Sequence, residues 1–444
     1  MKLRALARPC GRTIAAALPF LLAAAPAFAQ TSGIDGGDTA WMLVATAIVL
    51  MMTMPGLALF YCGMVRKKNV LATMAQSFAA AALVSVLWMI FGYGLSFTGE
   101  GRYIGDLLSR PFLTGIAMTS VSPFAKTIPE SLFMIYQMTF AVITVALIAG
   151  SVAERMRFSA FMLFSALWLT FVYVPLAHWV WGGGFLAQAG LLDFAGGTVV
   201  HINAGVAGLV CALILGKRQG YGSENLAPYD LSMAVAGTGL LWVGWFGFNG
   251  GSAYGANSRA AMAIVATHLA ASSGALTWVV MEWLSRGRPS VLGLISGAVA
   301  GLGTVTAASG YILPWQGAAI GVIAGALCFF ASTSIKRWLG YDDSLDVFGV
   351  HGVGGVLGTV LTGVFATAAV SAGPDAPNGY SGLLEGNVQQ LLTQLYGVGV
   401  TIAYCAAATL LILLAVAIVT PLRVEKRSEI EGLDIAEHGE SIHA

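Results

Sequence analysis

The segment DFAGGTVVHINAGVAG, residues 193–208, recurs in outline as DSLDVFGVHGVGGVLG, residues 343–358. Both follow the pattern Asp-x7-His-x3-Gly-x2-Gly, with Asp193 and His201 in the first copy and Asp343 and His351 in the second. In a helix, offsets of four and seven residues lie on one face, so each histidine shares its face with two glycines. A second helix can therefore approach closely at the place where each imidazole points.

Both copies lie within apolar segments that are long enough to cross a bilayer. The chain of 444 residues is 57% hydrophobic and only 10% charged, and its mean hydropathy is +0.80. A soluble domain cannot hide that much apolar surface, so the composition predicts an all-α polytopic membrane protein. Eleven transmembrane helices are expected, at about 40–65, 70–97, 127–151, 158–178, 197–216, 229–249, 260–284, 290–309, 313–336, 347–369 and 390–420.

The two histidine segments are the fifth and tenth of these spans, which gives them opposite orientations. Equivalent elements of opposite sense predict a 5+5 inverted repeat, with halves at about 38–218 and 228–370 and a last helix at about 390–420 outside the repeat. Sites in such repeats lie near the membrane midplane, between the halves. Three Gly-xxx-Gly pairs that favour close helix packing are Gly297 with Gly301, Gly321 with Gly325 and Gly354 with Gly358.

The ends of the chain carry orientation signals. Residues 1–29 combine a basic start, an apolar stretch and Ala27-Phe28-Ala29, which predicts a cleaved signal peptide; an uncleaved first helix is the alternative. With the mature N-terminus outside, fourteen Lys and Arg residues fall on the cytoplasmic side and four outside. This positive-inside bias predicts a transmembrane domain over 30–422 and a cytoplasmic tail over 423–444, most simply a solvated, mobile end.

Two facing imidazoles can share a proton and line a narrow polar track, because one ring nitrogen donates while the other accepts. Such a track suits a small polar solute or a proton. Metal binding is the alternative, but two histidines without nearby Cys or paired carboxylates form an incomplete ligand set. Asp193 and Asp343 are interpreted as helix N-caps, and Asp193 also as a negative charge that attracts a cation. The net charge of +1 provides no basic field for nucleic acid.

A second group of residues is aromatic. Trp181 precedes three glycines at a helix end, Trp245 and Phe248 close the sixth span, Phe140 lies in the third, and Ser252 follows the sixth. Single aromatic residues at a membrane interface are usually belt residues. A cluster of Trp and Phe beside a Ser hydroxyl can instead hold a small cation by cation–π contacts.

Six longer motifs carry a resemblance to a known family. They are AGGTVVHINAGVAG (195–208), DVFGVHGVGGVLGT (346–359), GWFGFNGGSA (244–253), AERMRFSA (153–160), PLAHWVWGGG (175–184) and PGLALFYCGMVRKKNV (55–70). In these motifs the chain resembles the ammonium transporter (Amt/Mep/Rh) family, on its bacterial Amt branch. The resemblance extends to the tail, where EGLD-x3-HGE occupies 431–440.

The resemblance implies a homotrimer in a bacterial inner membrane, with a pore through each protomer and a peripheral last helix. It implies an external ammonium site at Phe140, Trp181 and Ser252, a gate of Phe140 and Phe248 with Trp245 nearby, and twin pore histidines, His201 and His351. Asp193 matches an Asp that the family needs near the entrance. Cys62 and Tyr136 depart from the family pattern, and Tyr136 is expected to change hydrogen bonding in the vestibule.

The partners implied are ammonium or ammonia, methylammonium as an analogue, the lipid bilayer and a cytoplasmic P-II-type regulatory protein. No cofactor and no enzymatic activity are expected. The alternative function is an ammonium sensor or scaffold that signals through the P-II-type partner, with the tail and the loop 217–229 as docking surfaces. Electroneutral and electrogenic transport are both compatible with these residues.

Overall fold

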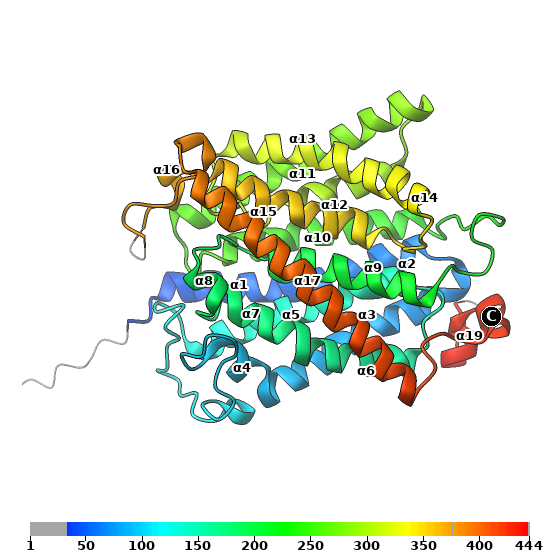
Figure 1. The fold of residues 1–444 in the computed structure, drawn as a ribbon, viewed down its shortest axis with the longest axis horizontal. Helices are drawn as coiled ribbons and strands as arrows, with labels where there is room; N and C mark the ends of the chain where they lie inside the picture. The colour runs from blue at the N-terminus through cyan, green and yellow to red at the C-terminus, as the bar shows by residue number, and fades with distance from the viewer. Residues whose placement is uncertain (1–32, 374–375, 443–444) are drawn as a thin grey trace, which may run out of the picture.

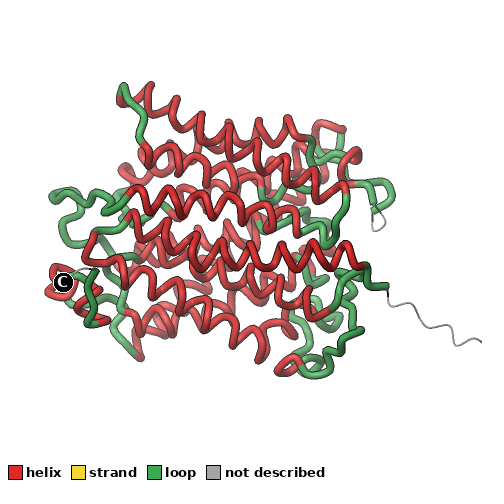
Figure 2. The backbone as a smooth tube through the Cα atoms, turned by 180° about the vertical axis from the view of Figure 1, so that it is seen from behind, coloured by secondary structure: helices red, strands yellow, loops and turns green. Residues whose placement is uncertain are grey.

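The computed structural model describes residues 33–373 and 376–442, so the predicted signal peptide at 1–29 lies outside the described residues. Within these ranges the regular structure is helical, and the helices run side by side between two faces that carry the loops (Figures 1 and 2). We call the face with residue 36 and the loop 98–129 the amino-terminal face, and the face with the tail 423–442 the carboxy-terminal face.

The α-helices that build the spans are α1 (Gly36–Met51), α2 (Ala58–Met64), α3 (Val70–Leu87), α4 (Tyr93–Phe97), α5 (Glu130–Val152), α6 (Phe158–Trp168), α7 (Val174–Val180), α8 (Phe185–Gln188), α9 (Asn203–Leu215), α10 (Leu231–Gly251), α11 (Ser258–Arg286), α12 (Val291–Val305), α13 (Pro314–Phe330), α14 (Lys336–Leu339), α15 (Val353–Phe365) and α17 (Val388–Val419). A short helix, α16 (Ala368–Ser371), precedes the last span, and α18 (Lys426–Glu431) and α19 (Leu433–His438) form the tail. π-Helical turns join several of these into continuous rods, such as α1 with α2 and α6 with α7, while the short turn 181–184 separates α7 from α8.

Ten helical rods in the described ranges are long and apolar enough to cross a membrane, and α12 is a shorter apolar helix in the eighth position. The limits of the predicted eleven segments agree with these helices to within about four residues. The largest differences are at the first rod, which begins four residues before the predicted start, and at α12 and α15, which each end four residues before the predicted limit. After α12 the chain turns, and the carbonyl of Ala307 in this turn accepts a 3.0 Å hydrogen bond from the amide of Phe194.

The two halves repeat one packing pattern. In the first half α5 packs on α1 and α9, and α3 packs on α5 and α6; in the second half α12 packs on α10 and α15, and α11 packs on α12 and α13. The halves meet where α1 and α2 pack on α10, and where the turn before α9 packs on α15 and the turn before α15 packs on α9. This reciprocal contact of the fifth and tenth spans is the geometry of an inverted repeat, as predicted.

Glycine makes the helix crossings of the second half possible. A Cβ atom on Gly301 of α12 would lie 2.1 Å from the carbonyl oxygen of Ala270 in α11, and a Cβ on Gly321 of α13 would lie 2.2 Å from the same oxygen. Both α12 and α13 therefore contact α11 at backbone distance, which is the use predicted for the Gly-xxx-Gly pairs.

The last span lies outside the repeat. In Figure 1 α17 runs obliquely across the front of the bundle, where it packs on α6, α9 and α15. Several polar contacts fasten it: the indole of Trp168 in α6 donates a 3.0 Å hydrogen bond to Thr409, and the side-chain amide of Gln394 in α17 donates to the carbonyl of Leu192 at 2.7 Å. This agrees with the predicted peripheral last helix.

A buried charge cluster joins the loops of the carboxy-terminal face. The Arg218 guanidinium lies 3.3 Å from Glu154 and 2.9 Å from Asp342. Burial alone would raise the pKa of the Asp342 carboxyl, but the hydrogen bonds and charge of Arg218 outweigh it and hold the pKa below its ordinary 3.8. In the same way, Arg218 and Arg66 hold the pKa of Glu154 below its ordinary 4.5 despite its burial.

The tail is folded against this face, which differs from the solvated, mobile end suggested by its sequence. Glu429 accepts a 2.6 Å hydrogen bond from the amide of Gln219, and Asp434 accepts one of 2.8 Å from the amide of Ala72. Both carboxylates are buried. Charged residues without apolar periodicity can thus dock a segment when they satisfy buried backbone N–H groups.

Candidate functional site

The two histidines lie on π-helical turns, Gly197–Ile202 and Phe348–Gly352, that begin the fifth and tenth spans. A Cβ on Gly205 would lie 2.2 Å from the backbone of Gly352, and a Cβ on Gly355 would lie 2.9 Å from Cβ of His201. The glycines on each histidine face therefore let the two spans touch, as the repeated pattern predicts. π-Helical turns are common at functional sites.

This contact brings the imidazoles together. Nδ1 of His201 lies 3.2 Å from Nδ1 of His351, and the ring planes differ by 11°. Both rings are buried, at 1% and 3% exposure. A hydrogen bond between two ring nitrogens needs one donor and one acceptor, so a single proton lies between the pair.

Both histidines line a small cavity with otherwise mainly apolar walls, in which the centre of a water-sized solute has about 10 Å³ of free space. Its other lining residues are Met52, Leu57, Phe60, Ile143, Leu147, Val200, Leu241, Trp245, Phe248 and Val299. His351 also lines a second pocket, with about 150 Å³ of free space for the centres of water-sized solutes, whose walls include loop residues of the carboxy-terminal face, among them Pro228 and Ser344. His351 thus lies where the apolar cavity meets the more polar pocket.

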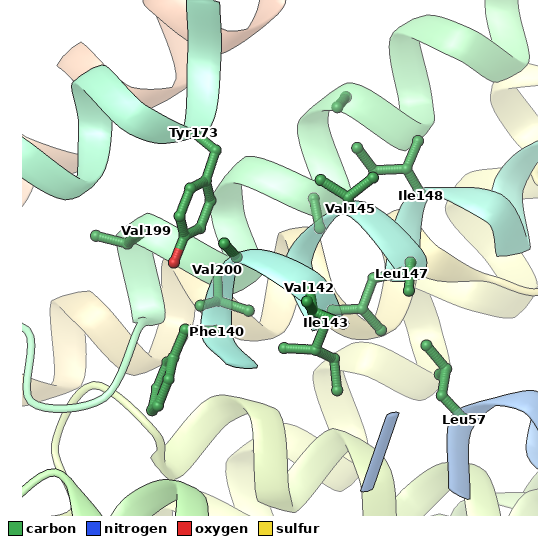
Figure 3. Packing of buried hydrophobic residues seen from close by; sticks show 14 of the residues in the cluster. Leu57, Phe140, Val142, Ile143, Val145, Leu147, Ile148, Tyr173, Val199 and Val200 are labelled. Atoms are coloured by element: carbon green, nitrogen blue, oxygen red, sulfur yellow. The ribbon is translucent and has the colours of Figure 1, made fainter. Parts of the chain in front are cut away.

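Aromatic rings continue the line from His201 toward the amino-terminal face. Phe248 forms part of the cavity wall and stacks on Phe140, with ring centroids 4.1 Å apart and planes 21° apart. Trp181 meets Phe140 edge to face at 5.7 Å, and Trp245 stacks on His201 at 5.6 Å. The two α5 side chains that line the cavity beyond Phe140 are aliphatic: Figure 3 shows Ile143 and Leu147 between Phe140 and Leu57.

Hydroxyl groups lie at the far end of this aromatic line. Ser252 directly follows α10, one helical turn after Phe248, and its hydroxyl donates a 2.8 Å hydrogen bond to the carbonyl of Phe248. The Tyr136 hydroxyl lies 3.4 Å from Oγ of Ser252. The indole N–H of Trp181 is directed away, to the backbone carbonyl of Asp193 at 2.8 Å, which fixes the ring over Phe140.

The two aspartates of the repeated pattern have different surroundings. Oδ1 of Asp193 accepts hydrogen bonds from the amides of Gly196 and Gly197, and Oδ2 accepts from the amides of Thr198 and Val199 and from the Thr198 hydroxyl. Asp193 therefore caps the helix that carries His201, and its carboxylate is saturated with hydrogen bonds.

Asp343 makes only one such contact, a 2.7 Å hydrogen bond from the amide of Phe348 to Oδ2. Its Oδ1 is buried and has no hydrogen-bond partner among the described residues. The nearby Lys336 donates instead to the Asp343 backbone carbonyl at 2.6 Å and to Asp346 at 2.8 Å. The capping interpretation thus fits Asp193 fully and Asp343 only in part.

The structure brings most of the predicted residues into one row: Ser252, Trp181, Phe140, Phe248, Trp245, His201 and His351. The aliphatic cavity walls were not predicted, and neither was the bond from the Trp245 indole to the Thr306 hydroxyl at 2.9 Å. Aliphatic residues in a membrane helix give no signal in the sequence that distinguishes a cavity wall from lipid-facing or core positions. Within the described ranges, no three His, Cys, Asp or Glu side chains gather as a metal site would require.

The chain that carries these residues is similar to known proteins over most of its length. A model of the Ammonium Transporter Family matches residues 40–442. The chain is 48% identical to an ammonium transporter of Aquifex aeolicus, over 94% of this chain and 96% of the relative, and 46% identical to one of Bacillus subtilis, over 92% and 98%. Among solved structures it is similar to Saccharomyces cerevisiae Mep2, at 38% identity and a TM-score of 0.83, with 88% of each chain covered. It is also similar to a structure described as a Sensor Amt Protein, at 28% identity and a TM-score of 0.81, over 90% and 98% of the chains.

Proposed function

This chain belongs to the Ammonium Transporter Family, and from that premise we propose that it recruits ammonium, removes its proton and conducts ammonia through the histidine-lined cavity. The observation that carries the proposal is the His201–His351 contact of 3.2 Å, inside a cavity that is otherwise mainly apolar. It supplies hydrogen-bonding groups for a small neutral solute where a bare cation would meet a large desolvation penalty.

Recruitment is assigned to Phe140, Trp181 and Ser252. The faces and edges of the two rings and the Ser oxygen can replace part of the water around ammonium, since each cation–π contact contributes about 0.5–2 kcal/mol. Asp193 adds a fixed negative charge behind Trp181, and its backbone carbonyl accepts the hydrogen bond from the Trp181 indole. Potassium has no proton to lose, so selectivity arises when the bound cation must become neutral to continue.

The stacked rings of Phe140 and Phe248 act as the gate between this site and the cavity. Their centroids are 4.1 Å apart, which leaves no room for a solute between them, so the rings must rotate to admit one. Trp245 is held by Thr306 and limits the space beside His201. Beyond the gate, ammonia exchanges hydrogen bonds with His201 and then His351 and leaves through the polar pocket. Asp343 is proposed to help hold the start of the span that carries His351.

We further propose that the amino-terminal face is external, that residues 1–29 are a cleaved signal peptide, and that the protein is a homotrimer in a bacterial inner membrane. A P-II-type partner would then meet the carboxy-terminal face, where the tail and the loop 217–229 are held together by the bond between Gln219 and Glu429. The alternative function, an ammonium sensor that acts through such a partner, is supported by the fold shared with the Sensor Amt Protein.

The test is the current triggered by ammonium in proteoliposomes, with potassium as the competing cation. Wild type, His201→Ala, His351→Ala and the control His268→Ala are compared; His268 lies on the outer surface of α11, outside the cavity. A current specific to ammonium shows transport with net charge, and ammonia flux without current shows electroneutral conduction. The absence of both current and flux would favour the sensor. Unchanged uptake in both His201→Ala and His351→Ala would contradict the role of the histidines.

A further inference from the structure

Tyr136 contacts the proposed external site from behind. It lies on α5 one helical turn before Phe140, its side chain is fully buried, and the two rings are 5.0 Å apart. Its hydroxyl lies 2.9 Å from the carbonyl oxygens of both Gly247 and Phe248 in the last turn of α10. The same hydroxyl oxygen lies 3.4 Å from Oγ of Ser252.

The two hydroxyl protons have better acceptors than each other. The phenol has one proton, which it donates to one of the two carbonyls at 2.9 Å. The Ser252 proton goes to the carbonyl of Phe248 at 2.8 Å, because the alternative contact with the phenol oxygen is longer. Ser252 therefore keeps its lone pairs free as an acceptor, which is the state that a cation with only N–H donors requires.

The phenol also ties together the two helices that build the site. Tyr136 and Phe140 are four residues apart on α5, and Phe248 and Ser252 are four residues apart across the end of α10, so each pair lies on one helix face. The hydrogen bond from Tyr136 joins these faces at the turn that carries Ser252. It fixes the separation between the Phe140 ring and the Ser252 oxygen.

We propose that Tyr136 is a positioning residue for ammonium binding. Its hydroxyl holds the Ser252 side chain opposite Phe140 and leaves the Ser252 oxygen free to accept a hydrogen bond. The inference rests on the proposed function, because it concerns the affinity of the external site assigned there. It concerns no step in the cavity below the gate, which Tyr136 does not line.

The experiment is a double-mutant cycle on ammonium transport by the full-length protein in proteoliposomes. Tyr136→Phe keeps the buried ring and removes only the hydroxyl, and we expect the half-saturating ammonium concentration to rise about fivefold, as for the loss of one hydrogen bond, with little change in maximal flux. In the Ser252→Ala background the same change should have almost no further effect. Tyr254→Phe is the matched control, since the Tyr254 hydroxyl is bonded to Gln137 at 2.7 Å and not to Ser252.

Each other outcome overturns the inference. If Tyr136→Phe raises the half-saturating concentration equally with and without Ser252, the residue is merely structural. If Tyr136→Phe or Ser252→Ala changes nothing, or if Tyr254→Phe has the same effect as Tyr136→Phe, the hydroxyl does not act through Ser252. Should Tyr136→Phe fail to fold, Ser252→Ala alone tests the inference, because an unchanged half-saturating concentration in that variant shows that Ser252 is not the acceptor and overturns it. Wild-type protein without ammonium-specific flux contradicts the proposed function itself, which is a separate result.

Discussion

The substitution Asp193→Asn tests whether the start of the fifth span depends on a saturated carboxylate. Asparagine has nearly the same shape but presents one oxygen and one NH2 group. Because each carboxylate oxygen accepts from two backbone amides, Gly196 and Gly197 or Thr198 and Val199, either orientation of the new side chain leaves two buried N–H groups facing another donor. At about 1–3 kcal/mol for each orphaned donor, we expect a loss of about 4 kcal/mol in the free energy of unfolding.

Asp343→Asn is the matched control, since it makes the same change at the equivalent position of the second repeat. There the amide oxygen can keep the single bond from the Phe348 amide, so the expected loss is below about 1 kcal/mol. Both variants would be unfolded with denaturant in mixed micelles, and their free energies of unfolding compared with wild type. Equal losses in the two variants, or no loss in Asp193→Asn, would refute the reasoning.

Three further outcomes are expected. Gly205→Ala places a Cβ 2.2 Å from the backbone of the opposing histidine helix and should destabilise the protein by about 1–3 kcal/mol and abolish ammonium flux, whereas Gly399→Ala, with nothing within 4 Å, should do neither. Arg218→Ala leaves buried carboxylates unpaired, so the free energy of unfolding by denaturant should fall by about 3–5 kcal/mol. Lys217→Ala, at the exposed neighbouring position, should lower it by less than about 0.5 kcal/mol. The pKa of the Asp342 carboxyl is lowered in the folded state, so the stability that Asp342 contributes is present above about pH 4 and is lost as the pH falls below the ordinary pKa of 3.8. The free energy of unfolding, measured from pH 7 to pH 3, should show this loss in wild type and much less of it in Arg218→Ala.

The sequence was sufficient to predict the fold because a membrane restricts the choices. Long apolar segments must be helices, charge bias orders them across the bilayer, and the repeated Asp-x7-His pattern relates the fifth span to the tenth. The sequence could not predict features that depend on contacts between segments far apart in the chain. The turn after α12 accepts a hydrogen bond from Phe194, more than a hundred residues away. In the docked tail, Glu429 and Asp434 accept from the amides of Gln219 and Ala72, which are more than two hundred residues away.

At the site, the polar and aromatic residues were predictable because each is costly or unusual at its position in a membrane helix. The histidines, Trp181 and Ser252 belong to this class. The Leu57, Ile143 and Val299 walls were not, since their packing depends on which helix faces meet. Tyr136 was identified only as a departure from the family pattern, and its hydrogen bonds to α10 could be found only in three dimensions.

The sequence repeat makes the two histidines equivalent, but the structure does not. Nε2 of His201 is buried beneath Phe248 and Trp245 without a partner among the described residues, whereas His351 borders the pocket that reaches the carboxy-terminal face. With neutral rings and one proton between the Nδ1 atoms, the ring that donates there has an acceptor at Nε2, and its partner has an N–H donor. Transfer of the shared proton, with proton exchange at both outer nitrogens, reverses both ends together. The pair can therefore offer a donor or an acceptor at the sealed end while the open end offers the other, which is what a solute that both donates and accepts hydrogen bonds requires.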